Sequence, residues 1–118
     1  MMRAHPTLFI ALTSRTPTGE CFECGDGWQQ IVDEASGALT ALASAARAKG
    51  FHVVQVKEKM GTLRIYVTGD VPAGADEVIE AARARSEVTC EWCGRPGQLR
   101  WEDGWARTVC TLCRVKRP

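Results

Sequence analysis

The sequence has almost no net charge and no long apolar run, and each absence excludes a class of protein. Fifteen Lys and Arg residues oppose 14 Asp and Glu residues, which leaves a formal net charge of +1. Overall electrostatics therefore demand neither a nucleic-acid nor a membrane partner. The apolar run at residues 8–12 has five residues, fewer than the ~7–15 of a signal peptide and the ~20 of a membrane span. A cytoplasmic protein is predicted.

Catalytic signatures are also scarce. The chain has two histidines, His5 and His52, and neither has an acid or nucleophile partner close to it in the sequence. No Ser/His/Asp, phosphate-loop or metallohydrolase pattern is present in the sequence. The sequence therefore does not predict an enzyme.

Cysteine, by contrast, occurs in a pattern. Cys90 and Cys93 form one Cys-x2-Cys pair, and Cys110 and Cys113 form a second pair after 16 intervening residues. This spacing is typical of a four-cysteine zinc site. In a cytoplasmic protein thiols stay reduced, which favours a metal over disulfides. The sequence predicts one structural Zn²⁺ held by these four thiolates.

The residues between the two pairs predict a β-hairpin. Residues 98–101 and 105–109 read as short strands, and Asp103-Gly104 between them is a strong turn signal. Such a hairpin returns the second cysteine pair to the first. Residues 89–118 are therefore predicted to form a zinc ribbon.

The preceding residues predict a helix–β-hairpin–helix body. Apolar residues recur at helical spacing from Trp28 to about residue 49, which predicts a first helix. Residues 51–59 and 62–68 read as two strands, joined by a turn at Met60-Gly61. Residues 75–87 read as a second helix. In the first strand Val54 and Val56 alternate with Gln55 and Lys57, a pattern typical of a strand with two different faces. The predicted fold class is α+β, with an extended lead-in at 1–20, the body at 21–88 and the zinc ribbon at 89–118.

A further thiol pair, Cys21 and Cys24, precedes the first helix. It could supply a second metal half-site, a redox pair with Cys24 as the reactive thiol, or two ordinary buried thiols. Nearby acids such as Glu23 and Asp26 raise a thiol's pKa, which favours the buried thiols.

Two groups of residues are candidates for contact with a partner. Lys57, Lys59 and Arg64 can meet an acidic or phosphate-bearing partner if they share one face of the hairpin. Residues 83–118 carry a net charge of +4, from eight basic and four acidic side chains. In this region basic and aromatic residues alternate as on nucleic-acid surfaces: Arg100, Arg107, Arg114, Trp101 and Trp105. The competing interpretation places at least two of Trp92, Trp101 and Trp105 in the core of the ribbon.

Three strings together resemble a family of short, uncharacterised bacterial and bacteriophage proteins. The strings are Glu-Cys-Gly-Asp-Gly-Trp at 23–28, Gln-Val-Lys-Glu-Lys at 55–59 followed by Gly61 and Leu63-Arg64, and the cysteine-rich segment at 90–100. The family often has Phe at the position of Met60 and His at that of Cys113. It has no established activity, but the resemblance implies a phage or mobile-element setting, in which small proteins bind host machinery.

The sequence thus favours a small zinc-stabilised module that binds a host or bacterial protein as an inhibitor or adaptor. Nucleic-acid binding through the basic ribbon is the first alternative, and a cysteine or redox enzyme at Cys24 is the second.

Overall fold

The computed structural model describes residues 22–23 and 25–116; the predicted lead-in at 1–20 lies outside them. The elements follow one another as β1 (Phe22–Glu23), a 3-10 helix η1 (Asp26–Trp28), α2 (Gln29–Ala46), β2 (His52–Lys59), β3 (Thr62–Thr68), α3 (Ala75–Ser86), β4 (Gln98–Glu102), β5 (Trp105–Val109) and α4 (Thr111–Lys116). The α+β class and the predicted order of helix, hairpin, helix and hairpin are confirmed.

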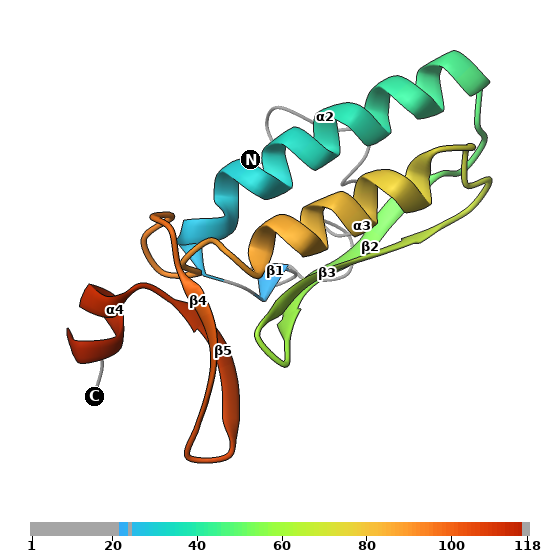
Figure 1. The fold of residues 1–118 in the computed structure, drawn as a ribbon. Helices are drawn as coiled ribbons and strands as arrows, with labels where there is room; N and C mark the ends of the chain where they lie inside the picture. Colours follow the sequence, from blue (N-terminus) through green and yellow to red (C-terminus); the bar gives the residue numbers. More distant parts are fainter. Residues whose placement is uncertain (1–21, 24, 117–118) are drawn as a thin grey trace.

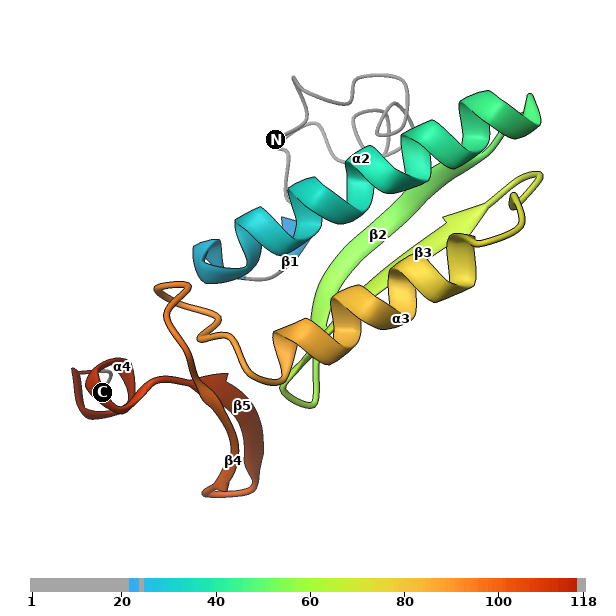
Figure 2. The ribbon, with the colours of Figure 1, turned by 45° about the horizontal axis from the view of Figure 1, so that its top comes forward.

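The body is a two-layer structure. Its sheet has the strand order β1-β2-β3, with β1 parallel and β3 antiparallel to β2. Helices α2 and α3 pack together on one face of this sheet and run along its strands (Figure 1, Figure 2). The core between the layers contains the apolar side chains that helical and strand periodicity point inward, among them Trp28, Ile31, Val32, Leu39, Val53, Val56, Leu63 and Ile65.

The expected alternation in β2 is wrong at Val54. Val53 and Val56 are buried, whereas Val54 is only half-buried. The pairing register with β3 shifts between Val53 and Gln55. A β-bulge places one extra residue on one strand, so residues on its two sides can reach the same face at an odd spacing.

Helix α2 ends earlier than the predicted residue 49. Its last residue is Ala46, and Arg47 adopts the left-handed conformation with φ 52°. The N–H of Ala48 donates to the carbonyl oxygen of Ala43 at 3.0 Å. This closing bond across the last turn is typical of a helix C-terminus, and it ends the helix before the glycine at position 50.

Both predicted hairpin turns are confirmed. Met60 and Gly61 have φ values of 53° and 83°, and Asp103 and Gly104 have 53° and 80°. Positive φ at both central residues is the two-residue turn that fits the twist of paired strands. The β4–β5 hairpin extends away from the body, at the end where α2 begins and α3 ends (Figure 1, Figure 2).

Candidate metal centre

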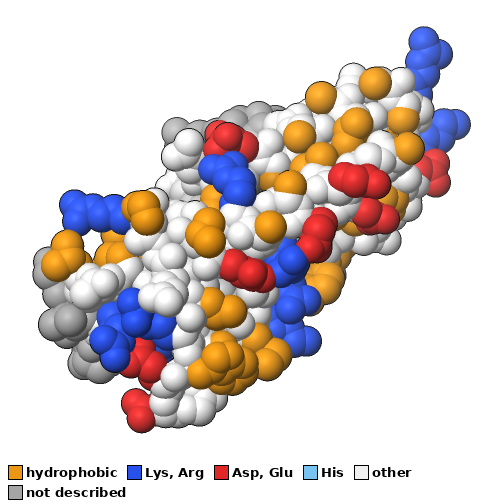
Figure 3. Space-filling view, viewed as in Figure 1, with side chains coloured by type: hydrophobic (Ala, Val, Ile, Leu, Met, Phe, Trp, Pro, Cys, Tyr) orange, Lys and Arg blue, Asp and Glu red, His pale blue; other side chains and the backbone are white. Residues whose placement is uncertain are grey.

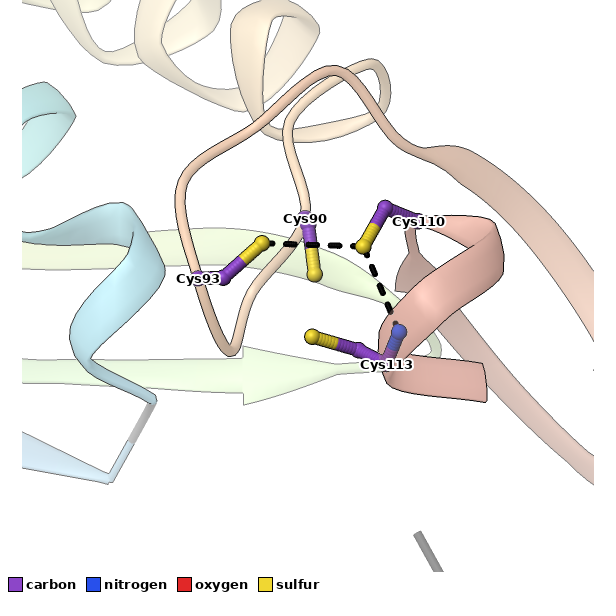
Figure 4. A group of neighbouring side chains, drawn as sticks. All are labelled: Cys90, Cys93, Cys110 and Cys113. Carbon is purple, nitrogen blue, oxygen red and sulfur yellow. Dashed lines mark hydrogen bonds between the residues drawn. The ribbon is translucent and has the colours of Figure 1, made fainter. Parts of the chain in front are cut away.

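The four predicted ligands meet at one point. Cys90 and Cys93 lie in the loop after α3, Cys110 precedes α4, and Cys113 lies within α4. Their side chains point toward one another (Figure 4), with all four sulfur atoms within 4.8 Å of each other. All four cysteines are free of disulfides. This group can therefore hold a metal ion.

The sulfur spacing fits a tetrahedral site. Four thiolates at the ~2.3 Å of a zinc–sulfur bond have sulfur atoms about 3.8 Å apart. The Sγ atoms of Cys93 and Cys110 are 3.6 Å apart. No two of the four sulfur atoms are more than 4.8 Å apart, so they need to move only slightly closer together to bind one ion. Among biological metals, both zinc and iron bind in tetrahedral sites made of four sulfur ligands.

The thiols are close enough to shift one another's pKa values in opposite directions. The backbone N–H of Cys113 lies 3.4 Å from the Cys110 sulfur, and this donor is the main cause that lowers the pKa of Cys110 to about 6. Burial, followed by hydrogen bonding to the neighbouring thiols, raises the pKa of Cys113 to about 12. Four thiolates this close repel one another, so full ionisation of the cluster requires a cation.

The first cysteine pair is shaped by glycines and by backbone bonds. Gly94 has φ 83°, a conformation that glycine adopts without strain, and its N–H donates to the Cys90 carbonyl at 2.9 Å. The Cys90 N–H donates to the Arg95 carbonyl at 2.7 Å, and the Glu91 N–H to the Thr108 carbonyl at 2.9 Å. These bonds form a tight knuckle, residues 90–94, and tie it to β5.

This knuckle contacts the 3-10 helix η1, which leads into α2. The Gly27 N–H donates to the Glu91 carbonyl at 2.6 Å, and the Gly25 N–H to the Glu91 carboxylate at 2.9 Å. Trp28 is fully buried and its indole N–H donates to the Thr89 carbonyl at 2.9 Å. The string at residues 23–28 therefore includes the contact between the body and the metal centre, a role that its sequence does not reveal.

A second contact joins the two hairpins. The Thr108 hydroxyl is buried and donates to the Gly61 carbonyl at 2.7 Å. A Cβ on Gly61 would lie 2.4 Å from Cδ1 of Leu99 and 3.2 Å from the Arg107 backbone nitrogen. The tip of the β2–β3 hairpin thus rests on the β4–β5 hairpin, and contacts cross the predicted domain boundary at residues 88 and 89 in two places.

Replacing Thr108 with Val tests the second contact. The change keeps the shape of the side chain but leaves the buried Gly61 carbonyl without its donor, so we expect a loss of about 1–3 kcal/mol in the free energy of unfolding. Thr40→Val is the matched control, because the Thr40 hydroxyl caps a carbonyl within α2 and its loss should stay within about 0.5 kcal/mol. Equal denaturation curves for the two variants would contradict the contact.

One edge of the metal centre opens to solvent. Cys93 is exposed and, with Gly94, lines an open cleft of about 630 Å³. Helix η1 and the start of α2 supply the opposite wall, through Asp26, Gly27, Gln29, Gln30 and Asp33. A chelator can therefore approach a bound metal at Cys93 without prior unfolding of the body.

The structure brings some predicted contact residues together. Lys57 lies directly opposite Arg64, and Lys59 opposite Thr62. Alternate residues of a strand share a face, and the Arg64 Nε donates to the Thr62 hydroxyl at 3.0 Å. Lys57, Lys59 and Arg64 therefore share the sheet face opposite the helices, which was the condition for joint contact with a partner.

The interpretation that placed at least two tryptophans in the ribbon core is wrong. Trp101 is 63% exposed and Trp105 is 69% exposed. The reason is geometric, since the β4–β5 hairpin projects from the body and none of the described helices or strands packs over its tip (Figure 1). Trp92 is half-buried, with the Arg107 guanidinium 5.7 Å above its ring centre.

The remaining candidate residues lie in different settings. Arg100 and Arg107 are directly opposite each other on β4 and β5. Arg114 pairs with Glu102 at 2.7 Å. Cys21 and Cys24 lie outside the described residues, so their roles as metal ligands, redox pair or buried thiols remain predictions.

Comparison of the chain with protein-family models, curated proteins and solved structures finds no match. Among the described residues, no helix has both the length and the apolar character needed to cross a membrane.

Proposed function

We propose that the protein is a small zinc-stabilised module that binds another protein, as an inhibitor or adaptor of host or bacterial machinery. The observation that carries this proposal is an exposed apolar patch at the junction of the two hairpins. We call Met60, Leu99 and Trp101 the junction patch. Met60 is 57% exposed and Trp101 is 63% exposed, and exposed apolar side chains that lie together mark interaction sites, whereas singly scattered ones do not.

The junction patch is continuous across two segments that are distant in sequence. Leu99 and Trp101 lie on the same face of β4, because residues two apart in a strand share a face. The Leu99 side chain lies where a Cβ on Gly61 would be, and Met60 precedes Gly61 in the turn. Figure 3 shows hydrophobic side chains gathered over this part of the molecule.

The patch is also held in place before any partner arrives. The buried Thr108–Gly61 hydrogen bond fixes one hairpin against the other, and the metal centre fixes the base of the β4–β5 hairpin. A surface that is ordered in the free protein loses less conformational entropy on binding. Zinc in this account supplies rigidity, and the apolar side chains supply affinity.

Protein is the partner class that fits this patch best. Exposed Trp and Met side chains are enriched at protein interfaces, where buried tryptophans often dominate the binding energy. An aliphatic residue such as Leu99 has neither a positive charge for a phosphate nor a hydrogen-bonding group for a base edge. The mobile-element resemblance supports a host protein as the partner.

The proposal is tested by affinity purification from a nuclease-treated bacterial lysate, followed by binding measurements with the partner recovered. Met60→Asn with Trp101→Thr removes the apolar side chains but keeps residues suited to the turn and the strand. We expect binding to weaken at least about 30-fold. The matched control is Val71→Thr, which removes an exposed apolar side chain from the connector before α3. Unchanged affinity in the double variant, or an absence of any stoichiometric partner, would contradict the proposal.

A further inference from the structure

The face of the β4–β5 hairpin opposite the junction patch concentrates positive charge. Arg100 lies directly across from Arg107, and Glu102 directly across from Trp105. Side chains opposite each other across a ladder share a face, so these four residues lie together. We call this the arginine face. It turns away from the β2–β3 hairpin, which contacts Leu99 and Thr108 on the other side.

The positive charges on this face are not balanced. Arg114 from α4 bonds Glu102 through Nε at 2.8 Å. This hydrogen bond is the main cause that lowers the pKa of Glu102, and the charges of Arg100 and Arg107 lower it further. Three guanidinium groups therefore surround one carboxylate. Figure 3 shows blue basic side chains gathered around red acidic ones beside the β4–β5 hairpin.

This arrangement carries a cost that an anion would remove. Like charges directly opposite each other destabilise a strand pair. The Nε atom of Arg100 is buried and has no hydrogen-bond partner among the residues that the structure describes. A buried charged donor without an acceptor is unfavourable, and an oxyanion bound between Arg100 and Arg107 relieves both penalties.

The geometry of the neighbouring side chains favours a particular oxyanion. Arg107 is held over the Trp92 ring, so its position is set before any ligand binds. Trp105 is 69% exposed on the same face. An arginine pair beside an exposed indole matches the way proteins hold single strands, with cations on phosphates and aromatic rings stacked on bases.

We propose that the arginine face binds single-stranded nucleic acid, with Arg100 and Arg107 on a phosphate and Trp105 stacked on a base. The site is separate from the junction patch, so the hairpin presents a protein-binding face and a nucleic-acid-binding face. This arrangement suits an adaptor that places a protein partner on a nucleic acid. None of the residues of the arginine face belongs to the junction patch, so mutations can test nucleic-acid binding and protein binding independently.

The test measures binding of a fluorescein-labelled oligothymidylate to the purified, metal-loaded full chain over a series of salt concentrations. Arg100→Gln with Arg107→Gln should lower the magnitude of the salt slope by about 0.7, the value for the one phosphate that this arginine pair no longer neutralises. Trp105→Ala should weaken binding about 5- to 30-fold. A matched control, Arg47→Gln with Lys49→Gln, removes two positive charges at the opposite end of α2 and should leave the slope unchanged.

Further measurements keep the test decisive. If the glutamine variant does not fold, Arg100→Lys with Arg107→Lys retains the charges and should keep the salt slope, while Trp105→Ala tests stacking independently. No binding at low salt, or the same loss in the Arg47 and Lys49 control, overturns the proposal. Competition by inorganic phosphate or polyglutamate as strong as that by the oligonucleotide also overturns it, since the ligand would then be a free anion or an acidic protein. None of these results changes the interpretation of the Met60 and Trp101 variants, which test protein binding.

Discussion

Replacing Cys93 or Cys110 with serine should release the metal and unfold the chain from about residue 89 onward. A structural zinc can contribute roughly 10 kcal/mol or more of binding free energy that is also folding free energy. The β4–β5 hairpin has exposed tryptophans and few buried aliphatic side chains. Burial in this region therefore cannot replace the metal, because whole domains are stable by only about 5–15 kcal/mol.

The loss should also spread into η1 and the first turn of α2. Gly25, Gly27 and Trp28 are bonded to residues 89 and 91, so an unfolded knuckle leaves these donors without acceptors. Amide hydrogen exchange would detect the change, with protection lost in residues 89–116 and reduced in residues 25–30, while β2, β3 and α3 remain partly protected. Retention of full protection in the β4–β5 hairpin of either variant would contradict the account.

Replacing Gly27 with alanine should destabilise the protein and weaken the binding of the proposed zinc ion. The added Cβ would lie 2.1 Å from the Cys90 carbonyl oxygen and 2.5 Å from the carbonyl carbon of Glu91. Both are backbone atoms, which cannot move aside as a flexible side chain can. Overpacking of this kind costs about 1–3 kcal/mol and sometimes more. We expect a lower melting temperature and faster zinc release to a chelator.

Gly50→Ala is the control for this prediction. Gly50 has φ 67°, and no atom lies within 4 Å of the position that an alanine methyl group would take there. Its replacement therefore strains the backbone by about 1–2 kcal/mol without contact with the knuckle. The Gly50 variant should melt earlier than wild type but release zinc at the wild-type rate. If Gly27→Ala also releases zinc at the wild-type rate, the contact of the knuckle with η1 does not support the metal centre.

Much of the local structure could be predicted because it depends on residues that are close together in the sequence. The four cysteines converge as their spacing predicts, and Met60-Gly61 and Asp103-Gly104 turn as expected because few residue pairs tolerate positive φ at both positions. Strand β1 and helix α4 were not predicted. Two residues are too few to carry a strand pattern, and the turn that holds Cys110 and Cys113 continues into a helix that the cysteine spacing does not require.

The features that could not be predicted depend on distant residues. Gly25 and Glu91 are 66 positions apart, and Trp28 and Thr89 are 61 apart, so no periodicity links them. The bulge in β2 changes which valines face the core through pairing with another strand. The exposure of Trp101 and Trp105 follows from the projection of one hairpin from the body, whereas their apolar character alone suggested burial.

The most direct test of the central claim is the metal content of the purified wild-type protein. Elemental analysis together with native mass spectrometry should find one zinc per chain, and the absorption spectrum should lack the visible bands of iron–thiolate sites. Cys21→Ser should contain the same amount of zinc, because the proposed site takes all four ligands from Cys90, Cys93, Cys110 and Cys113. A wild-type protein that is fully folded without metal would contradict the account, and loss of zinc in Cys21→Ser would assign a ligand outside this cluster.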